Sequence, residues 1–204
     1  MKILVTGAAG FIGFHLCRSL LKKGYKVVGI DNINDYYDIN LKYARLNELG
    51  ITRDQSEIFL NRSIGDKYNN LFQFVRMNLE DRENLPILFK ESEFDVVCNL
   101  GAPAGVRYSI ENPETYIDSN IVWFLNILEC CRQNKIKHLL YASTSSVYGE
   151  NNKFPLKENY ETSNPLTFYA ATKKSNEVMA YSYSNIYKLP STGLRFFTVY
   201  GPWG

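Results

Sequence analysis

The first residues of the chain place a strand, a glycine turn and a helix in immediate succession. Residues 2–6, Lys-Ile-Leu-Val-Thr, have the apolar run of a buried strand, and apolar spacing at Ile12, Leu16 and Leu20 indicates a helix. Between them lies Gly7-Ala-Ala-Gly10-Phe-Ile-Gly13. Such a turn directs the free N–H groups and positive dipole of the helix N-terminus at a phosphate. The order predicts a dinucleotide-binding α/β unit; the alternative is a turn that is glycine-rich without a ligand.

Each glycine has its own expected role. Gly7 makes the tight turn, Gly10 lets the backbone approach a pyrophosphate, and Gly13 allows close packing of helix on strand. A second strand, residues 26–30, ends at Asp31, about 20 residues beyond the turn, where a ribose-binding acid belongs. That carboxylate would repel a 2′-phosphate and no Arg follows it closely, so the sequence favours NAD over NADP. A solvated strand end is the alternative interpretation of Asp31.

The rest of the chain continues to alternate strands with helices. Further strands are expected at residues 72–76, 94–100, 138–142 and 191–197. Helices are expected near 41–49, from Asp81, from Pro113 to about Asn134 and around Tyr169 to about Lys188, while residues 51–70 look like an irregular surface excursion. The helix from Pro113 should bury one stripe, formed by Ile117, Ile121, Phe124, Leu128 and Cys131.

This pattern predicts an α/β fold, a Rossmann-like doubly wound parallel sheet with helices on both faces. We expect residues 1–204 to form one NAD-binding domain that carries the catalytic residues.

Composition excludes several classes of function. The 23 basic and 21 acidic residues leave a net charge of +2, which gives no basic field for nucleic acid. No run approaches the ~20 apolar residues of a membrane span and no signal peptide is evident, so we expect a cytoplasmic protein. The four cysteines, Cys17, Cys98, Cys130 and Cys131, lack Cys-x-x-Cys spacing and are expected to be buried thiols, with no metal site.

Tyr169 and Lys173 lie four residues apart and share one helix face. Alone, this spacing arises by chance in a chain with 15 Tyr. Thr144, however, follows the expected strand at 138–142, and a hydroxyl delivered from a strand end completes a proton-handling triad around a sugar alcohol. An ordinary Tyr on an amphipathic helix is the alternative.

Seven segments together resemble the extended short-chain dehydrogenase/reductase, or NAD-dependent epimerase/dehydratase, family. They are the glycine turn, Asp31-Asn32, Gly105-Val-Arg-Tyr-Ser109, Ser119-Asn120, Thr144-Ser-Ser-Val-Tyr-Gly149, Tyr169-x-x-x-Lys173 and Leu194-Arg-Phe-Phe-Thr-Val-Tyr-Gly-Pro-Trp203. Within the family they are most similar to the nucleotide-sugar 4-epimerases that act on UDP-glucuronate. The resemblance covers essentially the whole chain, with residues 51–70 the least distinctive.

The resemblance implies a mechanism. Tyr169 would take the proton of the sugar 4-hydroxyl as carbon 4 is oxidised by NAD, giving a 4-keto sugar that is reduced again from its other face. A free Tyr titrates near pH 10, so Lys173 and the nicotinamide charge are expected to lower the pKa of Tyr169. Thr144 would hydrogen-bond the reacting oxygen. The implied NAD-binding residues are Gly7, Gly10, Phe11, Ile12, Gly13, Asp31, Asn32, Asn78, Leu79, Leu100, Ala102, Asn120, Tyr169, Lys173 and Phe196.

The residues expected to bind a UDP-sugar are Arg107, Ser145, Ser146 and Thr198. Ser145 and Ser146 offer hydroxyls that suit a sugar carboxylate, or else they only satisfy the turn backbone. Arg107 can face either the pyrophosphate or the sugar. Dehydratases of the superfamily usually carry acids at the two serine positions, so their absence argues against a 4,6-dehydratase.

The chain departs from the family pattern at several points. Pro103 stands in Gly101-Ala-Pro-Ala-Gly105 and removes a backbone donor beside the cofactor, which should weaken NAD binding. Asn78 replaces an adenine-binding Asp, a mild change. Trp123 replaces a small residue on a helix expected to form a homodimer, where it would lie between subunits. Relatives also continue beyond Gly204 into a smaller lobe that binds uridine, so we expect that lobe to be absent.

Two functions of different classes follow. One is an NAD-dependent UDP-sugar 4-epimerase, for UDP-glucuronate and UDP-galacturonate, represented by its cofactor lobe. The other is a non-catalytic NAD-binding module. Action on a different nucleotide sugar, or net oxidation of a sugar, are further alternatives.

Overall fold

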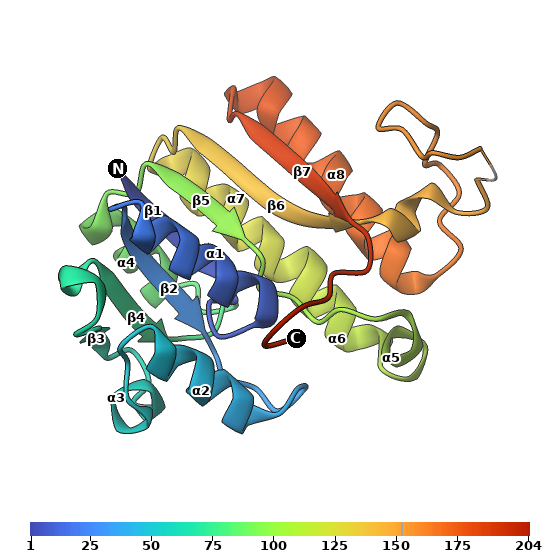
Figure 1. The fold of residues 1–204 in the computed structure, drawn as a ribbon. Coiled ribbons are helices and arrows are strands. Elements are labelled where there is room, and N and C mark those ends of the chain that lie inside the picture. The colour runs from blue at the N-terminus through green and yellow to red at the C-terminus, as the bar shows by residue number, and fades with distance from the viewer. Residues whose placement is uncertain (152) are drawn as a thin grey trace.

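One seven-stranded sheet organises the molecule, in the order β3-β4-β2-β1-β5-β6-β7 (Figure 1). The computed structural model describes residues 1–151 and 153–204. The strands are β1 (Lys2–Thr6), β2 (Lys26–Asp31), β3 (Arg62–Ile64), β4 (Phe72–Arg76), β5 (Val96–Asn99), β6 (His138–Thr144) and β7 (Ser191–Phe196). Only β3 pairs antiparallel with its neighbour, and all other pairs are parallel.

The strand order reverses between β1 and β5, because the chain builds outward from β1 to β4 and then crosses back to β5. A crevice forms outside the carboxyl ends of the strands at such a switch point. The predicted doubly wound parallel sheet is therefore confirmed.

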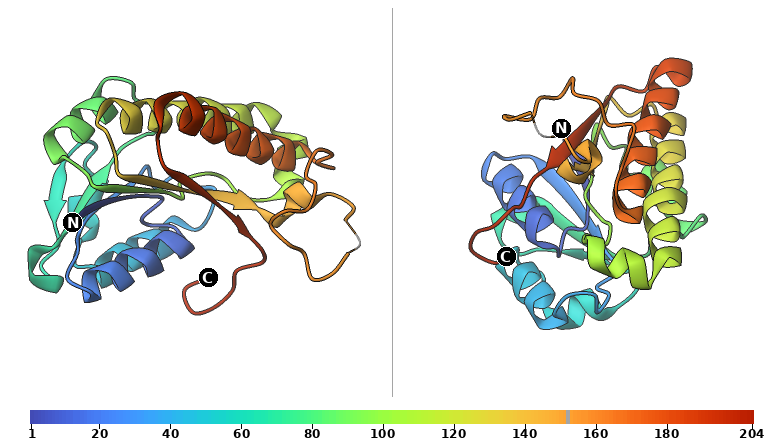
Figure 2. Two further views of the ribbon diagram at one scale, coloured as in Figure 1. Left: turned by 90° about the horizontal axis from the view of Figure 1, so that it is seen from above. Right: turned by 90° about the vertical axis from the view of Figure 1, so that its right-hand side faces the viewer.

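Helices cover both faces of the sheet and give the three layers of Figure 2. One face carries α1 (Phe11–Lys22) and α2 (Ile39–Glu48); the other carries α4 (Asn84–Ser92), α7 (Trp123–Gln133) and α8 (Phe168–Tyr187). The shorter helices are α3 (Arg53–Glu57), α5 (Val106–Glu111) and α6 (Pro113–Ile117). The 3-10 turns are η1 (Tyr68–Asn70) and η3 (Ser145–Tyr148), and η2 (Asp118–Val122) is a π-helical turn. No helix in the described ranges is long and apolar enough to cross a membrane.

The face that α1 buries differs from the predicted one. Phe14, Cys17 and Leu21 are buried, whereas Ile12, Leu16 and Leu20 are only partly so. A Cβ on Gly13 would lie 2.0 Å from the carbonyl oxygen of Gly7, so Gly13 must face the turn. Residues four and eight positions later then lie on that same face.

The predicted helix from Pro113 is interrupted by the π turn. Phe124, Leu128 and Cys131 are buried as expected, but Ile117 is 42% exposed and Ile121 is partly buried. A π turn closes over five residues instead of four and rotates the residues before it relative to those after it. The regular helical spacing used for the prediction is therefore wrong before Val122.

Residues 51–70 contain more regular structure than predicted. Helix α3 begins with a capping box between Thr52 and Gln55, and β3 adds an antiparallel edge to β4. Both elements are too short to show periodicity in the sequence. Helix α4 also begins later than predicted, at Asn84, whose backbone N–H donates to the Asp81 carboxylate at 2.8 Å. All four cysteines are buried and unpaired, as predicted.

Candidate active site

A cavity of about 670 Å³ lies at the carboxyl ends of the strands. Fourteen of the predicted site residues line it: Gly7, Gly10, Phe11, Ile12, Gly13, Asp31, Asn32, Leu79, Leu100, Ala102, Thr144, Tyr169, Lys173 and Phe196. Six predicted residues do not: Asn78, Arg107, Asn120, Ser145, Ser146 and Thr198. The structure thus brings the glycine turn, the acid after β2 and the triad to one cavity.

The glycine turn is built from backbone contacts. Gly7 has φ of +69°, and a Cβ there would meet the Gly101 backbone at 3.0 Å. The Asp31 carboxylate accepts from the backbone N–H of Ala9 at 3.1 Å and of Ile33 at 2.8 Å. One bond reaches the glycine turn and the other the loop after β2. Asp31 therefore holds together the two segments that line this end of the cavity.

A buried polar contact that the sequence did not reveal fixes the opposite wall. The Thr6 hydroxyl donates to the Asn99 side chain at 2.7 Å and accepts from the N–H groups of Leu100 and Gly101 at 3.0 and 2.8 Å. It joins the ends of β1 and β5 directly under the glycine turn. Satisfied buried contacts of this kind hold a cavity wall in one conformation.

The triad comes from two adjacent elements. Thr144 ends β6, and its hydroxyl accepts from the Ser146 N–H and donates to the Ser146 hydroxyl, both at 3.2 Å. Tyr169 and Lys173 lie on the first two turns of α8, which Thr167 caps by accepting from the Ala170 N–H. Tyr169 is 8% exposed and Lys173 is 5% exposed. The Lys173 ammonium donates to the Ala142 carbonyl at 3.3 Å.

Burial dominates the acid–base properties of the triad in the ligand-free protein. It raises the pKa of Tyr169, while the hydrogen bond with the Thr144 hydroxyl acts to lower it. Burial also lowers the pKa of Lys173 to about 8. Desolvation of the phenolate therefore outweighs its stabilising contacts in the protein alone, and a lowering of the Tyr169 pKa by Lys173 together with the nicotinamide charge stays a prediction.

Asn120 lies outside the cavity lining and is linked to Tyr169 through Thr172. Its side-chain NH₂ donates to the Thr172 hydroxyl at 2.9 Å, and Thr172 donates to the Tyr169 carbonyl at 2.8 Å. The Asn176 side chain donates to the Asn120 carbonyl. These bonds attach the π turn to the first turns of α8. Among the described residues nothing pairs with the Asn120 Oδ1, which is buried.

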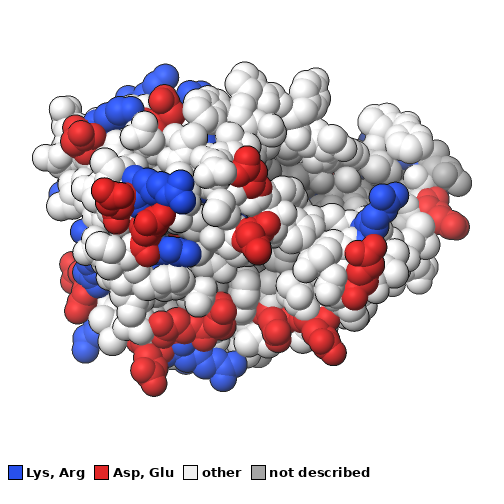
Figure 3. Space-filling view, turned by 90° about the horizontal axis from the view of Figure 1, so that it is seen from below, with Lys and Arg blue, Asp and Glu red and all other residues white. Residues whose placement is uncertain are grey.

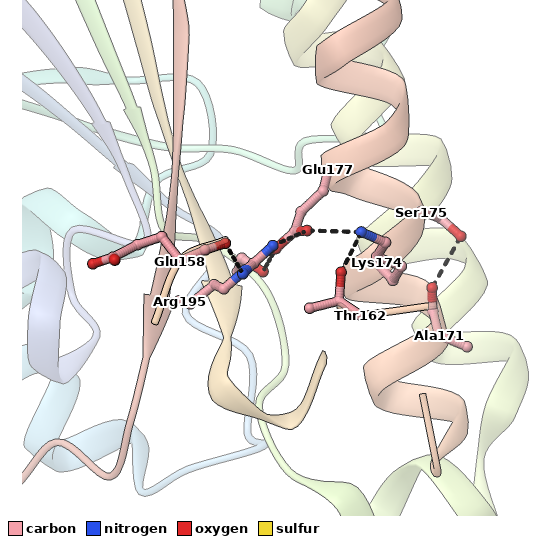
Figure 4. Close-up of polar contacts among 8 residues, drawn as sticks. Glu158, Thr162, Ala171, Lys174, Ser175, Glu177 and Arg195 are labelled. Carbon is pink, nitrogen blue, oxygen red and sulfur yellow. Dashed lines mark hydrogen bonds and ion pairs between the residues drawn. The ribbon is translucent and has the colours of Figure 1, made fainter. Parts of the chain in front are cut away.

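A second unpredicted network docks α8 on the sheet (Figure 4). The Glu177 carboxylate accepts from Ser143 at 2.7 Å and from two nitrogens of Arg195 at 2.9 and 3.0 Å. Lys174 bridges Glu177 to the Thr162 hydroxyl, and Arg195 donates to the Glu158 carbonyl at 3.0 Å. Glu177 follows Lys173 by one turn of α8, and Ser143 directly precedes Thr144 at the end of β6. The network therefore fixes the position of α8 relative to β6, the two elements that carry the triad.

Other residues line the cavity without having been predicted, among them Tyr36, Tyr37, Lys42, Arg45 and Trp123. Trp123 is partly buried, packs on the core and reaches the cavity, whereas its expected place between subunits stays a prediction. Pro103 also lines the cavity. The Tyr36 hydroxyl donates to the Ala104 carbonyl at 2.6 Å and joins the loop after β2 to the loop after β5.

Basic and acidic side chains are intermingled on the face drawn in Figure 3. No group of His, Cys, Asp and Glu suited to a metal ion occurs within residues 1–151 and 153–204.

The fold and the cavity define a doubly wound α/β protein with a dinucleotide-type glycine turn and a Thr–Tyr–Lys triad at the sheet edge. Residues 3–204 match the NAD dependent epimerase/dehydratase family, and the chain belongs to that family.

Several relatives match along the whole chain. It is 54% identical to protein CapI of Staphylococcus aureus and 47% identical to a probable UDP-glucuronate 4-epimerase of Rhizobium meliloti (strain 1021). All of the chain is matched, and it spans 56% and 55% of the length of these relatives. The UDP-glucuronic acid 4-epimerase of Bacillus cereus, solved with UDP-glucuronic acid and NAD, superposes with a TM-score of 0.83 at 37% identity. That match covers 99% of this chain and 58% of the solved one.

Proposed function

We propose that this chain is the NAD-binding and catalytic domain, residues 1–204, of a UDP-sugar 4-epimerase that interconverts UDP-glucuronate and UDP-galacturonate. The observation that carries the proposal is the meeting of Thr144, Tyr169 and Lys173 with the glycine turn in one cavity. The names of the Rhizobium and Bacillus relatives support the choice of sugar.

The residues present fit NAD. A Cβ on Gly13 would clash with the turn at 2.0 Å, which keeps the helix N-terminus close to the backbone that receives phosphates. In this proposal Gly7, Gly10, Phe11, Ile12 and Gly13 hold the pyrophosphate. Asp31 and Asn32 hold the adenosine ribose, and Leu79, Leu100, Ala102 and Phe196 form apolar walls. Asn78 and Asn120 lie outside the cavity lining and remain predictions.

The triad handles the proton in this proposal. When bound, NAD supplies the acceptor of hydride and a positive charge on its nicotinamide ring. Tyr169 removes the proton of the sugar 4-hydroxyl, and Thr144 holds the reacting oxygen by a hydrogen bond. Since burial raises the pKa of Tyr169, the protein by itself keeps the phenol protonated at neutral pH. Base catalysis by Tyr169 therefore belongs to the complex with cofactor and not to the empty protein.

Substrate binding is assigned to residues at the rim. Ser145 and Ser146 lie in the 3-10 turn after Thr144, while Arg107 and Thr198 are exposed beyond the cavity lining. We assign the uronate carboxylate to the two serines and the UDP phosphates to Arg107. A homodimer through α7 and α8 belongs to the same proposal, supported by exposed Val178, Tyr181 and Ile186 on α8.

One observation favours a second function. The Pro103 side chain in the cavity fits a nucleotide-binding module that does not turn over a sugar.

Two measurements on one sample distinguish the epimerase from the non-catalytic module. NAD binding is measured by calorimetry, and the sample is then incubated with UDP-glucuronate and analysed for UDP-galacturonate. Binding with conversion that Tyr169→Phe abolishes supports the epimerase. Binding without conversion supports the module, accumulation of NADH indicates net oxidation, and a failure to bind NAD rejects the proposal.

A further inference from the structure

Helix α2 buries two cations beside the cavity. Lys42 is 5% exposed and Arg45 is 4% exposed, and both line the cavity together with Asp31. Neither forms an ion pair within 4.0 Å in the part of the chain that the structure describes. Burying a charge without a paired partner is costly, so a ligand that accepts hydrogen bonds from these groups would offset part of that cost.

The hydrogen bonds of the two cations set them apart. Arg45 donates to the carbonyl oxygens of Ala9 and Trp203, and so ties the glycine turn to residues near Gly204. Lys42 donates to the carbonyl and the side-chain oxygen of Asn34, at 2.7 and 2.8 Å. An ammonium has three N–H donors, and the third finds no acceptor among the described residues. Lys42 therefore brings a free, charged donor to the cavity.

The neighbouring acid supplies the matching acceptor. Each Asp31 oxygen accepts one backbone N–H, from Ala9 or Ile33, and each retains a further lone pair. Burial lowers the pKa of Lys42 and the charge of Asp31 acts to raise it, which agrees with their proximity. A ribose has two adjacent hydroxyls, each of which can donate and accept. The Asp31 carboxylate can accept a hydrogen bond from one hydroxyl of this diol, while the Lys42 ammonium donates a hydrogen bond to a hydroxyl oxygen of the same diol.

We propose that Lys42 binds the adenosine ribose of the dinucleotide. Its ammonium donates a hydrogen bond to one hydroxyl of the ribose diol, and the Asp31 carboxylate accepts a hydrogen bond from the same diol. The inference rests on the proposed cofactor site and adds a residue to it. Nothing near Asp31 in sequence supplies a cation; α2 carries Lys42 eleven positions further along and the fold brings it back. A 2′-phosphate would also meet Lys42, but Asp31 would face the same phosphate and repel it.

The test is a comparison of ligands on matched variants. Lys42→Met removes the donor and the charge, Lys42→Gln keeps a neutral donor, and Lys90→Met removes an exposed lysine of α4 as the control. Each protein is titrated calorimetrically with ADP-ribose, its 2′-deoxy and 3′-deoxy analogues, and NADP. Thermal unfolding of each variant verifies that it is folded.

We expect the wild type to bind ADP-ribose about tenfold more tightly than at least one deoxy analogue, the usual effect of a charge-assisted hydrogen bond. Lys42→Met should lose about that factor for ADP-ribose and show little change for the analogue. Lys42→Gln should fall between them, and Lys90→Met should match the wild type.

Three results overturn the inference. Equal weakening of all ligands by Lys42→Met would mean that Lys42 acts only through the Asn34 loop. Unchanged affinities would mean that it makes no contact with the ligand. A wild type that prefers NADP would make Lys42 a phosphate-binding residue instead. If the wild type binds none of the ligands, the proposed function fails and this inference fails with it; the other outcomes leave NAD binding intact.

Discussion

Replacing Lys173 with methionine should stabilise the ligand-free protein. Burial lowers the pKa of Lys173 from 10.5 to about 8, a difference of about 2.5 units, and each unit corresponds to about 1.4 kcal/mol. The folded protein therefore carries a penalty of about 3 kcal/mol at neutral pH for burying the ammonium. Methionine has a similar length and no charge, but it forfeits the hydrogen bond to the Ala142 carbonyl, worth about 1 kcal/mol.

The net gain expected for Lys173→Met is about 2 kcal/mol at pH 7, or about 4–8 °C in Tm for a chain of this length. The pH dependence of this gain is set by the titration of Lys173 in the folded and unfolded states. Between pH 8 and 10.5 the unfolded wild type binds more protons than the folded one, so the wild-type unfolding free energy rises relative to that of the variant. The gain should be constant below about pH 8, fall as the pH rises, and reach zero before pH 10.5, because the lost hydrogen bond then outweighs the remaining burial cost.

Urea unfolding of wild type, Lys173→Met and the exposed-site control Lys90→Met, from pH 6 to 10, measures this difference. Other groups titrate equally in all three proteins and cancel. A destabilised Lys173→Met protein at pH 7, or a gain that does not change across the window, would refute the assigned burial cost. The variant should also fail in any epimerisation that the wild type performs.

Three further predictions test other parts of the structure. Gly13→Ala places a Cβ 2.0 Å from the Gly7 carbonyl and should cost about 3 kcal/mol or more in urea unfolding, whereas Gly24→Ala, with φ of +79° and open space, should cost about 1 kcal/mol. Burial acts to raise the pKa of Glu177, but hydrogen bonds from Arg195 and Ser143 outweigh it and leave that pKa lowered. Glu177→Gln should therefore cost about 2 kcal/mol at pH 7, and less as pH falls below 4.5, by the same measurement. Asp31→Asn should weaken NAD binding about tenfold and narrow the preference over NADP in calorimetry, and an unchanged preference would contradict the role of Asp31.

The parallel sheet was predictable because its strands are apolar runs bounded by turn residues. Residues 2–6, 72–76 and 138–142 lie inside the observed β1, β4 and β6. Glycine spacing placed the turn after β1, since only a residue without a Cβ fits at Gly13. The sequence pattern therefore also located the cavity, because ligands bind at the carboxyl ends of such strands.

Helix faces were harder to predict, because they depend on contacts rather than on spacing alone. The π turn at Asp118–Val122 changes the buried face before Trp123, and no residue type in that segment signals it. The position of Trp123 in the cavity lining was not predicted either. Short elements such as β3 exist only because β4 offers an edge to pair with.

Buried charge was the other feature that sequence could not supply. Glu177 pairs with Arg195 of the following strand, 18 positions away, and Lys42 donates to Asn34 in the loop before its own helix. Neither contact can be read from the residue types alone. The sequence could not supply the degree of burial around Tyr169 either. Spacing shows that Lys173 can reach Tyr169, but it does not show how much water is excluded from either group.

These buried charges give the cavity its electrostatic character. Lys42, Arg45 and Lys173 line it against the two acids Asp31 and Asp38, so the lining carries one positive charge in excess. The ligand-free fold bears the desolvation cost of these cations, as the lowered pKa values of Lys42 and Lys173 show. A pyrophosphate and the hydroxyls of two riboses can supply hydrogen-bond acceptors for these cations that the protein itself does not provide. Binding of NAD should therefore offset part of their desolvation cost and raise the free energy of unfolding.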